Sequence, residues 1–201
     1  MITKKDQPYG SPLDAVAISH HILGAILEEG DFAVDATAGN GLDTVFLAKV
    51  VGEEGQVWAF DLQEEALHKA EANLVIEAMR SRTTLRCKDH ALFAEDLPED
   101  MKGRIGAFLF NLGYLPGGDK EVTTTQVTTL AAFRQALEWI RLGGVVVVVL
   151  YPGHPEGARE KEVLLKEVSA LPVKSWQCFH ACSPLSHRKN PPEVLALRRR
   201  K

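Results

Sequence analysis

Apolar and polar residues occur along the chain in blocks that predict strands and helices in turn. Short apolar runs predict buried strands at residues 32–35, 56–61, 83–89, 105–111 and 145–151. Two further strands are expected later in the chain, at residues 173–181 and 193–199. Apolar residues at helical spacing predict helices over residues 12–29, 44–51, 63–79, 90–97, 125–142 and 156–171.

This alternation predicts the fold class. Strands that alternate with helices form a mostly parallel sheet with helices on both faces, so we expect an α/β, doubly wound, seven-stranded Rossmann-like sheet. The last two strands are expected to close it as an antiparallel hairpin. The run at 145–151 is the most apolar and is therefore expected at the centre. With 201 residues, 45% of them hydrophobic, we expect a single domain over residues 1–201.

Five predicted strands end on, or run directly into, a side chain with a polar group. Ligands of such sheets bind beyond the carboxyl ends of the strands, so these residues are candidates for a common site. They are Asp35, Asp61, Asp89, Asn111 and Tyr151.

The first turn, Gly39-Asn40-Gly41, is typical of a nucleotide-binding turn, but a dinucleotide fingerprint would carry Gly or Ala where Thr44 stands. Two carboxylates, Asp35 and Asp43, would repel a diphosphate at this helix N-terminus and favour a cationic ligand. S-adenosylmethionine is cationic and has no phosphate. A nicotinamide dinucleotide and a non-binding α/β domain are the alternatives.

The segment DATAGNG, with acidic residues after the second and third strands, resembles class I S-adenosylmethionine-dependent methyltransferases. Asp61 suits a ribose diol, and Asp89-His90 suits the adenine amine and ring face. The expected cofactor-binding residues are Asp35, Thr37, Gly39, Asn40, Gly41, Asp43, Thr44, Asp61, Gln63, Asp89, His90 and Asn111.

The fourth strand ends in Asn111-Leu112-Gly113-Tyr114, where amino-methylating enzymes carry Asn/Asp-Pro-Pro-Tyr. An Asn side-chain oxygen and the next backbone carbonyl can accept N–H bonds from an amine and align its lone pair with the methyl group. The match is partial and indicates an N-methyl acceptor. Asn190-Pro191-Pro192-Glu193 looks similar but falls in the final hairpin.

Several segments together are similar to one family over nearly the whole chain. FNLGYLPGGDK is the most specific of them, and DATAGNGLDTVFLA, CKDHALF, LYPGH and HRKNPPEVL accompany it. They resemble the tRNA wobble-uridine aminomethyl methyltransferases (MnmM-like), a family also known as rRNA methylases. The resemblance implies methyl transfer from S-adenosylmethionine to the amine of 5-aminomethyl-(2-thio)uridine in tRNA, giving 5-methylaminomethyl-(2-thio)uridine.

An in-line displacement at the sulfonium methyl requires the protonated amine to lose a proton first. His154, Tyr114, Tyr151 and Asp119 are candidates to accept that proton or to orient the amine. Aromatic packing for the tyrosines and a hydrogen bond to backbone for His154 stay open as alternatives. The expected catalytic residues are Asn111, Tyr114, Tyr151 and His154.

Binding of tRNA has to be reconciled with a net charge of −4. Residues 174–201 hold seven basic residues against Glu193 alone, a net charge of +6, which leaves −10 for the rest of the chain. This segment could steer a polyanion or be a solvated tail, and a homodimer could build a positive face. Residues expected to contact the anticodon stem-loop are Leu115, Pro116, Gly117, Asp119, Lys120, His187, Arg188, Lys189 and Asn190.

Other features limit the remaining classes of function. No apolar run has transmembrane length and the N-terminus lacks a signal core, so we expect a cytoplasmic protein without a membrane partner. Cys178, His180 and Cys182 alternate on one predicted strand, but a metal site would need a fourth ligand, and we expect no metal. His20 and His21, on the first predicted helix, are expected to be packing or surface residues.

Two rival functions remain at this point. One is a methyltransferase of the same fold acting on rRNA or a small amine. The other is a protein that binds S-adenosylmethionine or RNA without turnover.

Overall fold

The computed structural model describes residues 11, 13–113, 125–183 and 189–200. In this part of the chain seven strands form one sheet in the order β3-β2-β1-β4-β5-β7-β6. The strands are β1 Phe32–Asp35, β2 Gln56–Asp61, β3 Thr83–Cys87, β4 Ile105–Asn111, β5 Ile140–Leu150, β6 Trp176–Ala181 and β7 Glu193–Arg199. The predicted bounds of β1, β2, β4 and β7 are confirmed.

The sheet is parallel except around its penultimate strand. β1, β2, β3, β4 and β5 pair in parallel, whereas β7 is antiparallel to both β5 and β6. The predicted mixed sheet with an antiparallel C-terminal hairpin is therefore confirmed. The middle strand of the seven is β4 rather than β5, so the prediction that residues 145–151 lie at the centre is wrong by one position.

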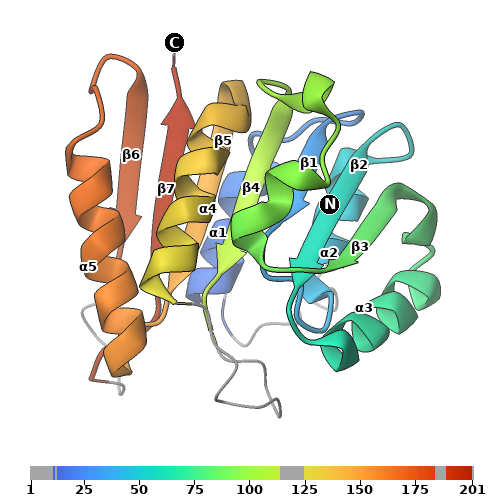
Figure 1. The fold of residues 1–201 in the computed structure, drawn as a ribbon, viewed down its shortest axis with the longest axis horizontal. Helices are drawn as coiled ribbons and strands as arrows, with labels where there is room; N and C mark the ends of the chain where they lie inside the picture. Colours follow the sequence, from blue (N-terminus) through green and yellow to red (C-terminus); the bar gives the residue numbers. More distant parts are fainter. Residues whose placement is uncertain (1–10, 12, 114–124, 184–188, 201) are drawn as a thin grey trace.

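Helices cover both faces of this sheet (Figure 1). One face carries α1 Ala15–Gly24, α2 Leu42–Val51 and α3 Glu64–Ile76, and the other carries α4 Gln126–Trp139 and α5 Pro155–Ser169. Short 3-10 turns lie at Arg80–Arg82, His90–Glu95 and Glu99–Met101.

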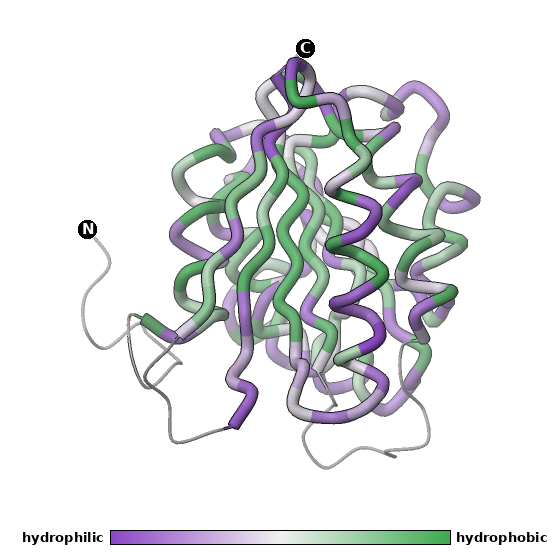
Figure 2. The backbone as a smooth tube through the Cα atoms, turned by 90° about the vertical axis from the view of Figure 1, so that its left-hand side faces the viewer, coloured by the Kyte–Doolittle hydropathy of each residue, from purple (hydrophilic) through white to green (hydrophobic). Residues whose placement is uncertain are grey.

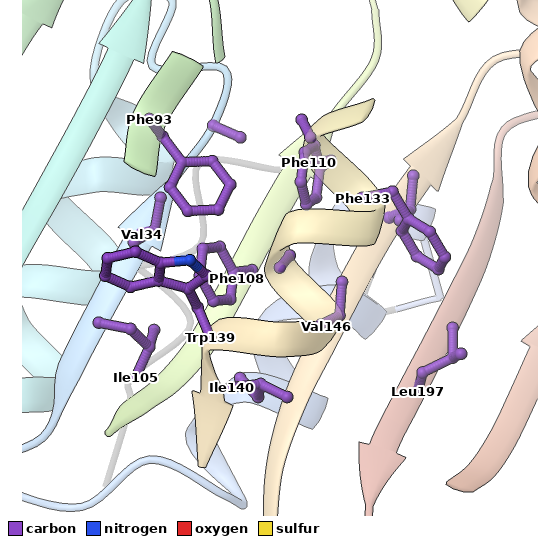
Figure 3. Close-up of a cluster of buried hydrophobic side chains, with 14 of the residues drawn as sticks. Val34, Phe93, Ile105, Phe108, Phe110, Phe133, Trp139, Ile140, Val146 and Leu197 are labelled. Atoms are coloured by element: carbon purple, nitrogen blue, oxygen red, sulfur yellow. The ribbon is translucent and has the colours of Figure 1, made fainter. Parts of the chain in front are cut away.

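The sheet separates two apolar cores, because successive residues of a strand point to opposite faces. Under α1 and α2, Leu23 and Leu47 pack on small residues such as Ala33 and Ala107. The α4 side is aromatic, as Figure 3 shows, and there Phe93 lies 5.1 Å from Phe108 between ring centroids. Burial of one such phenylalanine stabilises the fold by about 1.5–3 kcal/mol. Figure 2 shows the resulting pattern of hydrophobic strands between helices of mixed polarity.

The first helix is shorter than the predicted span of 12–29. It begins at Ala15, with Asp14 rather than Ser11 in the N-cap position, and it ends at Gly24. Asp14 Oδ2 accepts a hydrogen bond from the Ser11 backbone, so this acidic side chain organises the segment before the helix. After the helix, Leu27 stays buried in a turn, which explains why apolar spacing continues beyond the helix end.

The predicted helix over 125–142 also ends early. α4 stops at Trp139, and Ile140 has extended backbone angles and begins β5 opposite Ile105. Ile140 is fully buried in the sheet, and its place in the helical apolar pattern made the sequence ambiguous. Gly144 lies so close to the next strand that an added Cβ would come within 2.8 Å of the Gly106 carbonyl oxygen.

The remaining differences concern boundaries. Relative to the predicted segments, β3 ends at Cys87, α3 spans Glu64–Ile76, α5 spans Pro155–Ser169 and β6 begins at Trp176. α2 begins two residues earlier than predicted, and the short helix expected at 90–97 is a 3-10 helix over His90–Glu95.

Candidate functional site

The polar residues predicted to close the strands do lie at one edge of the sheet. Asp35, Asp61 and Asn111 are the last residues of β1, β2 and β4. Asp89 follows the end of β3 by two residues, and Tyr151 directly follows β5. Because these strands are parallel, their carboxyl ends share the edge opposite the labelled C-terminus in Figure 1.

The glycine turn after β1 is held to β2 by the carboxylate of Asp61. Its Oδ2 accepts a hydrogen bond from the Gly39 backbone at 2.8 Å, and its Oδ1 accepts one from the Gln63 backbone at 2.8 Å. The side chain therefore joins the first turn to the start of α3. Such a fixed carboxylate, with lone pairs left on each oxygen, can accept further hydrogen bonds from a diol.

Gly41 is required by both conformation and space. Its φ of +81° lies in the left-handed region, and an added Cβ would lie 2.7 Å from the Cα and Cβ atoms of Ala70 on α3. The turn therefore packs directly against the α3 backbone, and Asn73 on the same helix donates to the Asn40 carbonyl oxygen at 2.9 Å.

Asp35 is fully buried beneath this turn. Thr44 Oγ1 donates to its Oδ2 at 2.6 Å, and the Thr37 backbone donates to its Oδ1 at 3.1 Å. Burial, with a smaller contribution from the neighbouring charge of Asp43, raises the pKa of Asp35 to about 7. The side chain thus acts inside the turn, where it holds Thr44 at the position expected for a third glycine.

Asn111 joins β4 to the exit of β1 and to the start of α2. Its backbone N–H donates to Thr37 Oγ1 at 2.7 Å, and its side-chain Nδ2 donates to Asp43 Oδ2 at 2.9 Å. Asn111 Oδ1 is buried and has no hydrogen-bond partner within the described ranges. A shielded acceptor of this kind favours a ligand that brings an N–H or O–H group.

Two more predicted site residues also have a buried side-chain atom without a partner in the described part of the chain. They are Asn40, through Oδ1, and His90, through Nε2. Burial lowers the pKa of His90, so its imidazole is neutral at neutral pH, and its ring lies edge-on to Phe110 at 6.1 Å. Asp89 Oδ1 accepts from the Ala91 backbone and fixes the turn that carries His90.

Tyr151 and His154 lie at the exit of β5. An added Cβ at Gly113 would lie 3.1 Å from the Tyr151 ring, so this ring packs beside the segment that follows Asn111. His154 occupies the N-cap position of α5, and its Nδ1 accepts a hydrogen bond from the Gly157 backbone at 3.1 Å. The alternative of a backbone hydrogen bond, left open from the sequence, therefore describes one contact of His154.

Lys189 and Asn190 lie at the same edge of the sheet as Tyr151 and His154. Both are exposed, and an added Cβ at Gly153 would come within 3.4 Å of the Asn190 carbonyl oxygen. The segment that resembled Asn-Pro-Pro-Tyr thus reaches the loop after β5. The predicted catalytic residue Tyr114 lies outside the described residues, as do the other predicted contact residues: Leu115, Pro116, Gly117, Asp119, Lys120, His187 and Arg188.

The basic residues near the chain's end divide between two edges. Arg198 and Arg199 lie at the end of β7, opposite the site edge, where they donate to the carbonyl oxygens of Gly143 and Ile140. Arg200 lies at that far edge too, because its backbone N–H donates to the carbonyl oxygen of Ser175, just before β6. Its side chain is exposed. Among the described basic residues of this segment, Lys189 is the one at the same edge of the sheet as the site, because it precedes the start of β7.

Cys178 and His180 point to the same face of β6, whereas Cys182 follows the strand. His180 Nε2 lies 2.7 Å from Glu193 Oε2, and Lys161 Nζ lies 2.6 Å from Glu193 Oε1. Within the described ranges, no three His, Cys, Asp or Glu side chains are grouped closely enough to hold a metal ion.

The sequence predicts a packing or surface role for His20, and its ring does stack on Phe46, but its contact with Asp43 was not predicted. The structure places its Nε2 2.7 Å from Asp43 Oδ1, so it belongs to the network that ends on Asn111. Its position on an apolar helix far from the glycine turn gave no local signal of this contact. The pairing arises only when α1 and α2 pack on the same face of the sheet.

Comparison with known proteins places this geometry in context. Residues 57–198 match the family described as "Putative rRNA methylase". A relative from Arabidopsis thaliana, named tRNA (mnm(5)s(2)U34)-methyltransferase, chloroplastic, is 37% identical over an alignment of 173 residues that covers 82% of this chain. The matched region spans 62% of that relative's length.

Two solved structures of similar proteins have nearly the same fold. One from Clostridium thermocellum, with the same description as the family, has a TM-score of 0.88 at 32% identity and covers 94% of this chain and 100% of its own. One from Streptococcus mutans, in complex with S-adenosylhomocysteine (SAH), has a TM-score of 0.80 at 32% identity and covers 92% and 97%. The Rossmann-like α/β fold predicted from the sequence is confirmed.

Proposed function

Because the chain belongs to the rRNA methylase family, we propose that it is an S-adenosylmethionine-dependent tRNA methyltransferase. Its acceptor is the primary amine of 5-aminomethyl-(2-thio)uridine at the wobble position, and its product is 5-methylaminomethyl-(2-thio)uridine. The name of the Arabidopsis thaliana relative supports this substrate, and the SAH complex from Streptococcus mutans supports the cofactor. The observation that carries the proposal is the buried Oδ1 of Asn111 at the end of β4, which has no hydrogen-bond partner within the described residues.

The residues at the site edge fit S-adenosylmethionine. The carboxylates of Asp43 and Asp61 lie beside the glycine turn, which suits a ligand with a sulfonium and an ammonium group rather than a diphosphate. Lys88, which follows β3, is paired with Asp96 at 2.7 Å and with Glu95 at 2.9 Å. Asp61 would hold the ribose, and Asp89 with His90 would hold the adenine.

When bound, S-adenosylmethionine supplies an electrophilic methyl group on its sulfonium. Asn111 accepts an N–H bond from the amine of the acceptor through Oδ1, which orients the nitrogen lone pair. Asn111 is held at two points: its backbone N–H donates to Thr37 Oγ1, and its side-chain Nδ2 donates to Asp43 Oδ2. Catalysis by this chain consists of positioning the amine and excluding water.

The amine must also lose a proton before it can attack. His154 already accepts a hydrogen bond at Nδ1, so its neutral imidazole carries the ring hydrogen on Nε2. In that tautomer Nε2–H can donate to an acceptor oxygen, but neither ring nitrogen has a lone pair left to take up the proton of the amine. Among the described residues, we assign to Tyr151 the role of accepting this proton or orienting the amine, because its ring packs beside Gly113, two residues after Asn111. Tyr114 and Asp119 are the other candidates for this role.

The anticodon stem-loop is the proposed partner, held partly by Lys189 and Asn190 at the site edge. We also propose a cytoplasmic location for the protein and a homodimer as its assembly. Within the described ranges, no helix is both long and apolar enough to cross a membrane.

Methylation in vitro tests the proposal. Purified protein is incubated with S-adenosylmethionine and tRNA that carries 5-aminomethyl-2-thiouridine, and digested nucleosides are measured by mass spectrometry. We expect 5-methylaminomethyl-2-thiouridine to form. Ribosomal RNA and a small primary amine are tested in parallel, because the family description names rRNA. Product on those acceptors but not on tRNA would establish the alternative methyltransferase, and SAH binding without turnover would establish a binding protein.

Asn111→Ala tests the residue that carries the proposal. We expect its kcat to fall by about 100-fold or more, and calorimetry of SAH binding measures separately how far Asn111 also holds the cofactor. Gln56→Ala is the matched control, because it also removes an amide, one that bonds to Thr84 at the opposite edge of the sheet. Full activity of the folded Asn111→Ala variant would contradict the proposed role of Asn111.

A further inference from the structure

The first helix contributes a side chain to the site edge. His20 on α1 places Nε2 2.7 Å from Asp43 Oδ1, and the two side chains are only 12% and 8% exposed. The imidazole also stacks on Phe46 of α2, with 3.8 Å between ring centroids and 7° between ring planes. This stacking fixes the plane of the ring, and Nε2 is thereby directed at the carboxylate.

Asp43 also contacts Asn111, the residue proposed to accept the N–H of the amine. Asp43 uses its other oxygen, Oδ2, to accept the hydrogen bond of Asn111 Nδ2 at 2.9 Å. His20, Asp43 and Asn111 therefore form a continuous chain of hydrogen bonds from α1 through α2 to β4. Each of the three residues comes from a different element, so these hydrogen bonds form only when α1, α2 and β4 are packed together.

This arrangement decides which way the Asn111 amide points. An ionised carboxylate can only accept hydrogen bonds, so the amide must present its NH₂ group to Asp43. Oδ1 of Asn111 then points away from Asp43 and is left as a buried acceptor without a hydrogen-bond partner in the described part of the chain. The reversed amide would place two acceptors against each other and would present N–H donors where an amine N–H must be accepted.

We propose that His20 and Asp43 are positioning residues that lock the Asn111 amide in the orientation required to accept an amine N–H. Asp43 imposes the orientation, and His20 holds Oδ1 of Asp43 so that Oδ2 stays on Asn111. The role in catalysis rests on the proposed function. The orientation of the amide does not, and it can be measured separately.

Four variants test the proposal. His20→Ala removes the contact to Asp43, and His20→Gln restores an N–H donor at nearly the same reach. Asp43→Asn keeps the shape but can donate as well as accept, so it no longer imposes one amide orientation. His21→Ala is the matched control, because His21 lies on the same helix, is exposed and bonds to the carbonyl oxygen of Ala17.

We expect kcat on the tRNA acceptor to fall by about 10- to 100-fold in His20→Ala and in Asp43→Asn. The KM for S-adenosylmethionine in His20→Ala should stay within about twofold of the wild-type value, because the lost interaction serves the acceptor. His20→Gln should recover most of the activity, and His21→Ala should retain it. A general loss of stability would not separate kcat from KM, nor be rescued by glutamine.

The second readout is independent of turnover. In ¹⁵N-labelled protein, the side-chain NH₂ protons of Asn111 should exchange slowly in the wild type and faster in His20→Ala and Asp43→Asn. If the wild type methylates tRNA, the proposal stands only when the exchange rate and kcat change together, and any other result overturns it. If the wild type is inactive, the proposed function fails and the exchange rates alone decide the orientation. If His20→Ala does not fold, Asp43→Asn carries the same comparison.

Discussion

At the scale of single residues, the buried carboxyl of Asp35 has a measurable consequence for stability. Its pKa is raised from 3.8 to about 7 in the folded protein, mainly by burial. The folded state therefore binds the proton more tightly than the unfolded state. The stability that this proton provides is complete below pH 4 and is lost as the pH rises to about 7.

Asp35→Asn should remove this dependence, because an amide stays neutral at every pH. We expect the free energy of unfolding of Asp35→Asn, relative to the wild type, to increase between pH 4 and pH 8 by on the order of 4 kcal/mol. Urea unfolding at several pH values measures the difference. If the two proteins kept a constant difference over that range, Asp35 would not be protonated in the folded state.

Residue types allowed the position of three polar residues at one edge of the sheet to be predicted, but not the hydrogen bonds that connect them to other elements. Asp35, Asp61 and Asn111 could be found because each follows an apolar run, where a polar side chain has no packing role. His20 could not be found, since its partner Asp43 lies 23 residues away and meets it only through helix packing. Their assigned roles in binding stay predictions, and assays of the variants will decide them.

At the scale of elements, the glycine turn and α3 are joined by direct backbone packing at Gly41. Gly41→Ala should suffer two penalties: a positive φ of +81° and an overlap with Ala70 at 2.7 Å. We expect a loss of unfolding free energy of about 2–5 kcal/mol, the sum of strain and overpacking. Chemical denaturation provides the measurement, and SAH binding should weaken in parallel.

Gly103→Ala is the matched control for this prediction. Gly103 also has a positive φ, of +77°, but an added Cβ would meet nothing within 4 Å. It should lose only the cost of the backbone conformation, about 1 kcal/mol. Equal losses in the two variants would show that Gly41 is required for its conformation alone.

Element type was predictable wherever periodicity was clear, and element ends were not. The apolar spacing of 125–142 runs through Ile140, which is buried as the first residue of β5 instead of the last turn of a helix. A buried isoleucine satisfies either pattern, so only its pairing with Ile105 settles the boundary. In the same way, Leu27 is buried although α1 has already ended, so the apolar spacing predicts a helix that is too long.

At the scale of the whole molecule, charge is distributed between two edges of the sheet. Lys189 lies at the site edge and Arg200 at the far edge, and both are exposed. Reversal of either charge changes the net charge equally, so the two variants separate local contact from overall repulsion.

Lys189→Glu should weaken tRNA binding by at least about threefold and lower the slope of log Kd against log salt concentration by about 1. Arg200→Glu should leave both values close to those of the wild type. Filter binding or fluorescence anisotropy over a range of salt concentrations measures them. Equal effects from the two variants would mean that tRNA responds to the net charge and not to this edge.

The antiparallel course of β7 also decides how the protein can be handled in experiments. Since β7 runs from the site edge to the opposite edge, Arg200 and the glycine turn lie at opposite ends of the strands. A tag, dye or surface tether attached just after residue 200 therefore starts on the side away from the proposed RNA contact. Sensor chips and pull-down resins that hold the protein by this end leave the opposite edge facing solution.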